Sequence, residues 1–185
     1  MRTGAEIVWK PILLGRVLEA VNPALPETAF DPESPKARYQ AKSLSDWANF
    51  CGLTISIPSQ WSEGVEMALR GAVVAAENNV IEVFSKRIYE AYFGAQKDIN
   101  QLQLVVEIGS ECGLDKKQFQ NQIDASDTLA RLQHNTDELV ERGGFGCPTM
   151  FVGEDMYFGN DHMPLVEMAL AKAGSLRFVM PGQHG

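Results

Sequence analysis

The chain has 185 residues, which is enough for one domain with a sizeable core or for a small domain that carries an insertion. Its apolar content of 45%, charged content of 22% and net charge of -8 are those of a water-soluble protein, and they argue against a general affinity for nucleic acid or membranes. No apolar run approaches the roughly 18–20 residues that span a bilayer, and three scattered cysteines favour a reducing compartment, so the cytoplasm is the expected location.

The chain opens on an apolar, β-rich run, "EIVWKPILLG", at residues 6–15. Pro11 restricts this predicted strand to a strand end or a sheet edge, because proline has no N–H to donate to a neighbouring strand. Residues 21–35 then carry four prolines. This composition predicts a linker or an ordered binding loop.

From Lys36 to Arg142 nearly every segment has helical periodicity. Two sets of apolar residues show it most clearly, and they are Leu44, Trp47, Ala48 and Cys51, then Val80, Phe84, Ile88 and Tyr92. Gly52 is placed to end the first of these helices. Ser62, Asp98 and Asp115 are the predicted N-caps of later helices.

After residues 143–144 the hydrophobic period changes from that of a helix to that of a strand. "PTMFVG" and "MYFG" predict two short strands joined at "GED", which is a β-hairpin with glycine at the start of its turn. A terminal helix follows, with Asp161 as its predicted N-cap, Pro164 in its first turn and Gly174 at its end. This order predicts an all-helical insertion of residues 29–140 within a discontinuous domain of residues 1–28 and 141–185.

The Cys147–Pro148 pair stands between a glycine-rich turn and a strand. An X-Pro bond adopts the cis form at a cost of only about 0.5–1 kcal/mol, and we expect it here. A cis bond would turn the N–H and C=O of Cys147 out of the sheet, where they could pair with a cysteine-containing peptide. The chain has no Cys-x-x-Cys motif, which argues against a disulfide oxidoreductase. Ordinary hairpin chemistry and a thiol-binding site are the two interpretations that remain.

Residues 145–161, "FGCPTMFVGEDMYFGND", resemble the C-terminal signature of 2-hydroxychromene-2-carboxylate isomerases and kappa-class glutathione transferases. The segments "VWKPILLG", "SPKARYQAKSLSDWANFCGL", "MALRGAVVAAE" and "AYFGAQKDI" follow the order of that family, so the resemblance covers nearly the whole chain. It implies an α/β fold in which a thioredoxin-like sheet carries an inserted all-helical domain, as in DsbA-type oxidoreductases. "VWKPILLG" looks like the second strand of the family, so we expect the N-terminal β-α unit to be missing.

The resemblance implies glutathione as the cofactor and carries six binding residues over to this chain. They are Asn22, Lys36, Cys147, Pro148, Asn160 and Asp161. The backbone of Cys147 would pair with the cysteinyl part of glutathione. Asn160 and Asp161 would hold the γ-glutamyl end, where a helix N-terminus favours the carboxylate and Asp161 offers a countercharge to the ammonium. Asn22 and Lys36 would contact the glycyl end. Taken singly, these residues are ordinary turn, cap and surface residues, and only their joint pattern favours the site.

In the family a serine, followed by proline and an aromatic residue, stabilises the glutathione thiolate by a hydrogen bond. Ser34 and Pro35 are followed by Lys36 and are preceded by no predicted strand, so we reject Ser34 for this role. No catalytic residue is therefore assigned, and the serine is expected upstream of Met1. No pair of histidines has metal-ligand spacing, so no metal site is predicted.

The function implied by the resemblance is the glutathione-dependent interconversion of 2-hydroxychromene-2-carboxylate and trans-o-hydroxybenzylidenepyruvate, a step of aromatic catabolism. Two alternatives stay open: a kappa-class transferase that leaves glutathione on an electrophile, and a non-catalytic protein that binds glutathione or thiol peptides. The expected partners are a small aromatic-derived substrate and a second copy of the chain in a homodimer.

Overall fold

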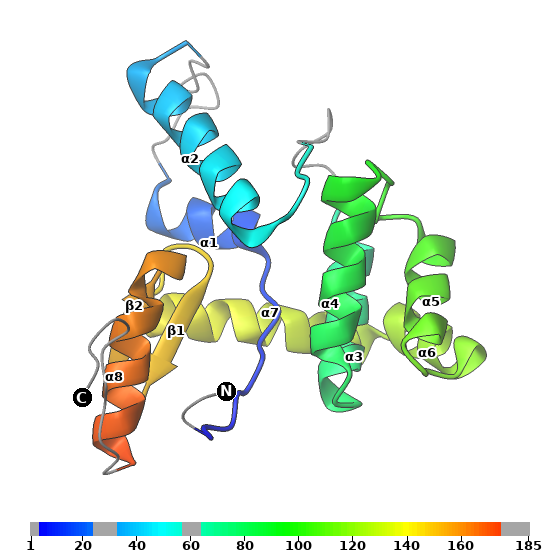
Figure 1. The fold of residues 1–185 in the computed structure, drawn as a ribbon. Helices are drawn as coiled ribbons and strands as arrows, with labels where there is room; N and C mark the ends of the chain where they lie inside the picture. Colours follow the sequence, from blue (N-terminus) through cyan, green and yellow to red (C-terminus); the bar gives the residue numbers. More distant parts are fainter. Residues whose placement is uncertain (1–3, 24–32, 57–63, 175–185) are drawn as a thin grey trace.

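The computed structural model describes residues 4–23, 33–56 and 64–174, and these ranges are mostly helical (Figure 1). The described elements, in chain order, are α1 (Leu14–Val21), α2 (Pro35–Cys51), α3 (Glu66–Glu77), α4 (Ile81–Tyr89), the π-helix η2 (Glu90–Gly94), α5 (Leu102–Glu111), α6 (Lys116–Asp124), α7 (Ser126–Glu141), β1 (Thr149–Val152), β2 (Asp155–Phe158), the 3-10 helix η3 (Asn160–His162) and α8 (Met163–Ala173). No helix of the described part is long and apolar enough to cross a membrane.

The main hydrophobic core lies among α3, α4, α5 and α6. The apolar face predicted for α4 is confirmed, because Phe84 and Ile88 are buried there. Phe84 packs edge-on against Phe119 of α6, with ring centroids 5.8 Å apart. Gly109 of α5 allows this close packing, since a Cβ at that position would lie 2.1 Å from the Phe119 ring.

The predicted hairpin is confirmed, and it forms the only sheet of the described residues. β1 and β2 pair antiparallel in a register that sets Thr149 opposite Phe158 and Val152 opposite Asp155. Gly153 takes a positive φ of 60° at the start of the turn, which glycine adopts without a steric cost. α8 packs against β1, and its first turn contains proline, as expected.

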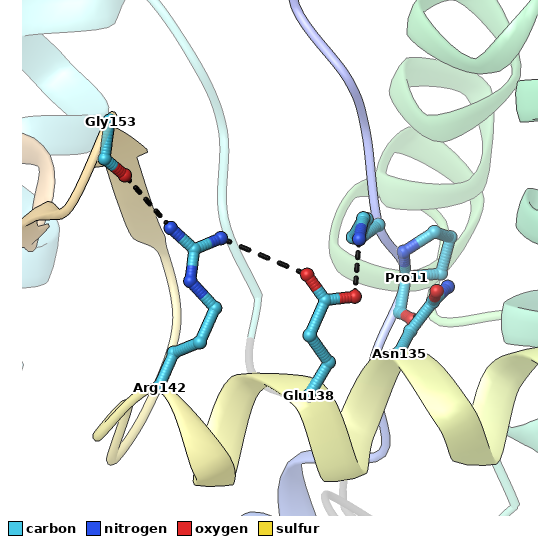
Figure 2. A network of polar contacts seen from close by, with 6 residues as sticks. Pro11, Asn135, Glu138, Arg142 and Gly153 are labelled. Atoms are coloured by element: carbon cyan, nitrogen blue, oxygen red, sulfur yellow. Dashed lines mark hydrogen bonds and ion pairs between the residues drawn. The ribbon is translucent and has the colours of Figure 1, made fainter.

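The strand predicted at residues 6–15 is wrong. Residues 6–13 form no strand, and α1 begins at Leu14. This segment crosses α7 instead, with Pro11 beside Asn135 (Figure 2). The Asn135 side chain donates to the Pro11 carbonyl at 3.2 Å, and the Leu13 N–H donates to Thr136 Oγ1 at 3.0 Å. A β-strand needs a neighbouring strand for its backbone groups, and here side chains of α7 bond to them.

The predicted helix ends are confirmed in part. Asp115 caps α6 by accepting the Gln118 N–H at 2.8 Å, and Gly52 ends α2 with a positive φ of 67°. Asp98 is not an N-cap, because α5 begins only at Leu102 and the Asp98 carboxylate accepts the Asn100 N–H within a turn. Ser62 and most of the proline-rich segment, residues 24–32, lie outside the described residues.

α7 joins the parts of the molecule. Its N-terminal half contacts α3 and α6, and Arg131 forms an ion pair with Glu77 at 2.7 Å. Its C-terminal half contacts α1 and the N-terminal segment, and Figure 1 shows it running from the hairpin towards α3. The domain boundaries at 28/29 and 140/141 remain a prediction.

Arg142, directly after α7, holds the turn of the hairpin (Figure 2). Its guanidinium donates to the Gly153 carbonyl at 3.0 Å and lies over the Phe151 ring, 3.7 Å from the centroid. It also faces Glu138 at 3.7 Å, and Glu138 forms an ion pair with Lys10 of the N-terminal segment. One chain of charges therefore connects the N-terminal segment, α7 and the hairpin.

Arg142→Ala should lower the free energy of unfolding by about 1–3 kcal/mol, because it removes a hydrogen bond, a cation–π contact and part of an ion pair. Urea unfolding measures this change. Arg38→Ala is the matched control, since the exposed Arg38 of α2 makes no such contact among the described residues, and its effect should stay within about 0.5 kcal/mol. Equal effects of the two substitutions would contradict the assigned role of Arg142.

The stability that Glu138 contributes should depend on pH. The hydrogen bond and charge of Lys10, with the charges of Arg142 and His134, hold the pKa of Glu138 below its ordinary value. Its contribution is therefore fully present above the unfolded-state pKa, about 4.3, and is lost as the pH falls through the lower pKa of the folded state.

Urea unfolding of the wild type and Glu138→Gln between pH 6 and pH 3 should show a stability difference that shrinks towards the acid end of this range. Glu141→Gln is the control on the same helix, and its difference from the wild type should change less. If the stability difference between the wild type and Glu138→Gln stays constant with pH, the stabilising ion pair between Lys10 and Glu138 is contradicted.

Candidate functional site

Cys147 and Pro148 lie in the loop between α7 and β1, and the bond between them is cis, as predicted. The loop is held tightly on both sides of this bond. The Gly144 N–H donates to the Leu139 carbonyl at 2.8 Å, and Thr149 Oγ1 donates to the Gly146 carbonyl at 2.7 Å. Gly146 must be small, because a Cβ there would lie 2.9 Å from the Phe158 ring.

The backbone of Cys147 is available to a ligand. The neighbouring Pro148 carbonyl accepts the Gly159 N–H at 3.0 Å and so closes the open end of the hairpin. Within the described part of the chain, neither the N–H nor the C=O of Cys147 makes a hydrogen bond. An exposed donor and acceptor on one rigid residue can pair with an extended peptide as a neighbouring strand would.

The Cys147 side chain is reached by solvent, yet the protein packed around the loop raises the pKa of its thiol by desolvation. The thiol is therefore protonated at neutral pH. A protonated thiol is a poor nucleophile. The position thus favours binding through the backbone over chemistry at the Cys147 sulfur.

Asn160 and Asp161 lie next to this backbone, in the 3-10 helix η3 between β2 and α8. They directly follow Gly159, whose N–H donates to the carbonyl of Pro148 in the loop. Both side chains are exposed. An amide and a carboxylate therefore stand beside the free backbone of Cys147.

Asp161 is not the N-cap of α8, contrary to the prediction. α8 begins at Met163, and the Asp161 carboxylate lies 3.2 Å from His162 Nδ1. A capping carboxylate bonds the N–H two or three residues on. Two residues after Asp161, the Met163 N–H already donates to the Asn160 carbonyl, and three residues on, Pro164 has no N–H. Apart from His162, the carboxylate remains open to a ligand.

Asn22 and Lys36 are not shown to belong to this site. Asn22 ends α1, with its N–H donating to the Leu18 carbonyl at 3.0 Å, and Lys36 is exposed in the first turn of α2. α2 has at most a slight contact with any other described helix or strand. The structure thus brings together four of the six predicted residues, and the roles of Asn22 and Lys36 remain predictions. Ser34 is the N-cap of α2 and accepts the Ala37 N–H at 3.2 Å.

Sequence reasoning did not single out Tyr89, the last residue of α4. Its side chain is exposed, and its pKa is raised by desolvation and then by the nearby Cys147 thiolate. Tyr89 and Phe93 are four residues apart, and their ring centroids lie 6.0 Å from one another. Among the described residues, no group of three or more histidine, cysteine, aspartate or glutamate side chains could hold a metal ion.

A family model described as a DSBA-like thioredoxin domain matches residues 1–171. A 2-hydroxychromene-2-carboxylate isomerase of Pseudomonas putida is 27% identical over 172 residues, which are 91% of this chain and 81% of that protein. An isomerase of the same name from Pseudomonas sp. (strain C18) is 26% identical over 141 residues, which are 75% of this chain and 64% of that protein.

Solved structures show the same fold. A selenomethionine 2-hydroxychromene-2-carboxylate isomerase superposes with a TM-score of 0.69 at 23% identity, covering 89% of this chain and 79% of that chain. A putative protein disulfide isomerase from Nitrosomonas europaea gives 0.58 at 18% identity and covers 88% of both chains. These likenesses confirm the α/β, thioredoxin-like fold expected from the sequence. With its family model matched over residues 1–171, the chain belongs to the DSBA-like thioredoxin domain family.

Proposed function

We propose that this protein is a glutathione-dependent isomerase that interconverts 2-hydroxychromene-2-carboxylate and trans-o-hydroxybenzylidenepyruvate. The observation that carries the proposal is the open end of the hairpin, where the unpaired backbone of Cys147 stands beside the exposed Asn160 and Asp161. The relatives named as isomerases of this substrate, at 26% and 27% identity, supply the reaction.

The residues of this end of the hairpin match the parts of a γ-glutamyl tripeptide. Cys147 offers one backbone donor and one acceptor, which is what an extended cysteinyl residue needs for antiparallel pairing. The Asp161 carboxylate is a countercharge for the γ-glutamyl ammonium. The Asn160 amide can donate to the carboxylate of the same γ-glutamyl residue of glutathione. Bound glutathione would supply the thiol that adds reversibly to the conjugated substrate.

The same residues argue against chemistry at the protein's own sulfur. The pKa of the Cys147 thiol is raised, and disulfide exchange requires a thiolate. Cys147→Ser should therefore preserve glutathione binding and isomerisation, since serine keeps the backbone donor and acceptor.

The assay for this function follows the interconversion of the two compounds by absorbance, with and without glutathione. We expect turnover only with glutathione, and the same turnover from Cys147→Ser. Glutathione binding without isomerisation would contradict the proposed reaction and favour a binding protein. Formation of a stable glutathione conjugate would favour a transferase, and loss of turnover in Cys147→Ser would show that the thiol itself reacts.

Asp161→Asn should weaken glutathione binding by about 10- to 100-fold, because a charge-assisted hydrogen bond to the ammonium is lost. Isothermal titration calorimetry measures the affinity. The substitution should change stability by no more than about 0.5 kcal/mol, since Asp161 does not cap α8.

Asp155→Asn is the matched control, because this exposed carboxylate lies at the opposite, turn end of the same hairpin. Its glutathione affinity should equal that of the wild type. If Asp161→Asn folds and binds glutathione as tightly as the wild type, the role assigned to Asp161 is wrong.

A further inference from the structure

The Asp161 carboxylate is folded back against the end of the hairpin. Its Oδ1 atom lies where a side chain on Gly159 would begin, 2.6 Å from the Cβ position of that residue. Gly159 takes a positive φ of 91°, which favours glycine, and its N–H donates to the Pro148 carbonyl at 3.0 Å. The carboxylate therefore lies against the residue that closes the hairpin beside the cis bond.

His162 makes a second contact with this carboxylate. Its Nδ1 atom lies 3.2 Å from Asp161 Oδ1, and its backbone N–H donates to the Gly159 carbonyl at 3.3 Å. Among the residues that the structure describes, no other side chain bonds to the Asp161 carboxylate. The same short turn therefore fixes the backbone of His162 and brings its ring to Oδ1.

The Asp161 side chain needs such a contact to keep one orientation. It is 68% exposed, and an exposed side chain occupies several rotamers in water. Ordering those rotamers when a ligand binds costs free energy and weakens the affinity. A hydrogen bond that already holds Oδ1 in the free protein reduces this cost. The lone pairs of Oδ2 stay open to a donor on the ligand.

His162 can hold the carboxylate without neutralising it. A neutral imidazole that carries its proton on Nδ1 donates to Oδ1 and places no positive charge beside Asp161. The carboxylate then keeps its full charge for a cationic group, and a charge-assisted hydrogen bond is stronger than a neutral one. This combination of a fixed orientation and a retained charge suits a ligand ammonium.

We propose that His162 is a positioning residue that orients the Asp161 carboxylate for the γ-glutamyl ammonium of glutathione. This inference rests on the proposed function, because the ammonium is the group assigned there to Asp161. His162 acts through Asp161 and not on the reacting sulfur. Loss of its Nδ1 donor should weaken the binding of a ligand that carries the ammonium and spare a ligand that lacks it.

The test compares glutathione with deaminoglutathione, which lacks only the γ-glutamyl ammonium, by isothermal titration calorimetry at about pH 7.5, where an imidazole in water is mostly neutral. The wild type should bind glutathione about 10- to 100-fold more tightly than the analogue. His162→Leu and His162→Ala should reduce this preference by about 2- to 10-fold, as expected for one hydrogen bond, and leave the affinity for the analogue unchanged.

His162→Asn should retain the preference for glutathione. The asparagine amide nitrogen is separated from the backbone by as many bonds as histidine Nδ1, and it donates in the same way. In the Asp161→Asn background, His162→Leu should have no further effect, because the two residues act through one contact. His134→Leu removes an exposed histidine of α7 and is the matched control, with the preference of the wild type.

A preference that is unchanged in His162→Leu and His162→Ala would overturn the inference. An equal loss of affinity for both ligands would overturn it too, and so would a loss in His162→Asn as large as in His162→Leu. If the wild type binds both ligands equally, this inference and the role of Asp161 are wrong, while glutathione binding itself stands. If neither ligand binds the wild type, the proposed function is wrong as well.

Discussion

The position of the hairpin depends on the charges at the C-terminal end of α7. Arg142 holds the hairpin turn through the Gly153 carbonyl and the Phe151 ring, and Glu138 links Arg142 to Lys10. The two-stranded hairpin is too small to be stable alone, because isolated hairpins are marginal in water. It keeps its place because α8 packs against β1 and because Arg142 fastens its turn to a helix whose other half contacts the core helices.

The fixed hairpin presents its opposite end to a ligand. The Gly159–Pro148 hydrogen bond ends the ladder there, so the Cys147 backbone is left unpaired next to Asn160 and Asp161. The desolvated, protonated thiol of Cys147 then has no chemical task in the proposed reaction. In the proposed function the site would bind a thiol supplied by the ligand, so a chain without Cys-x-x-Cys would need no reactive cysteine of its own on its thioredoxin-like fold.

Local signals predicted most of the secondary structure and part of the site. The hairpin was predicted from Gly153 and the alternating apolar residues, and the cis bond from Pro148. All of these signals lie within one short segment of the sequence. The strand at residues 6–15 was wrong because a strand requires a partner, and periodicity carries no information about partners. Asp161 matched the pattern of an N-cap, but the Met163 N–H bonds Asn160 in the 3-10 turn and Pro164 has no N–H to offer. The contacts of Arg142 with the hairpin join segments that local patterns cannot relate.

Amide hydrogen exchange at Cys147, followed by NMR with and without saturating glutathione, tests the central claim most directly. Pairing of glutathione with the backbone should slow exchange of the Cys147 N–H strongly, because an exposed amide becomes a strand-like donor. The Gly159 N–H is already bonded to Pro148 and should be protected in both states. An unchanged exchange rate at Cys147 with glutathione bound would show that the ligand does not use this backbone.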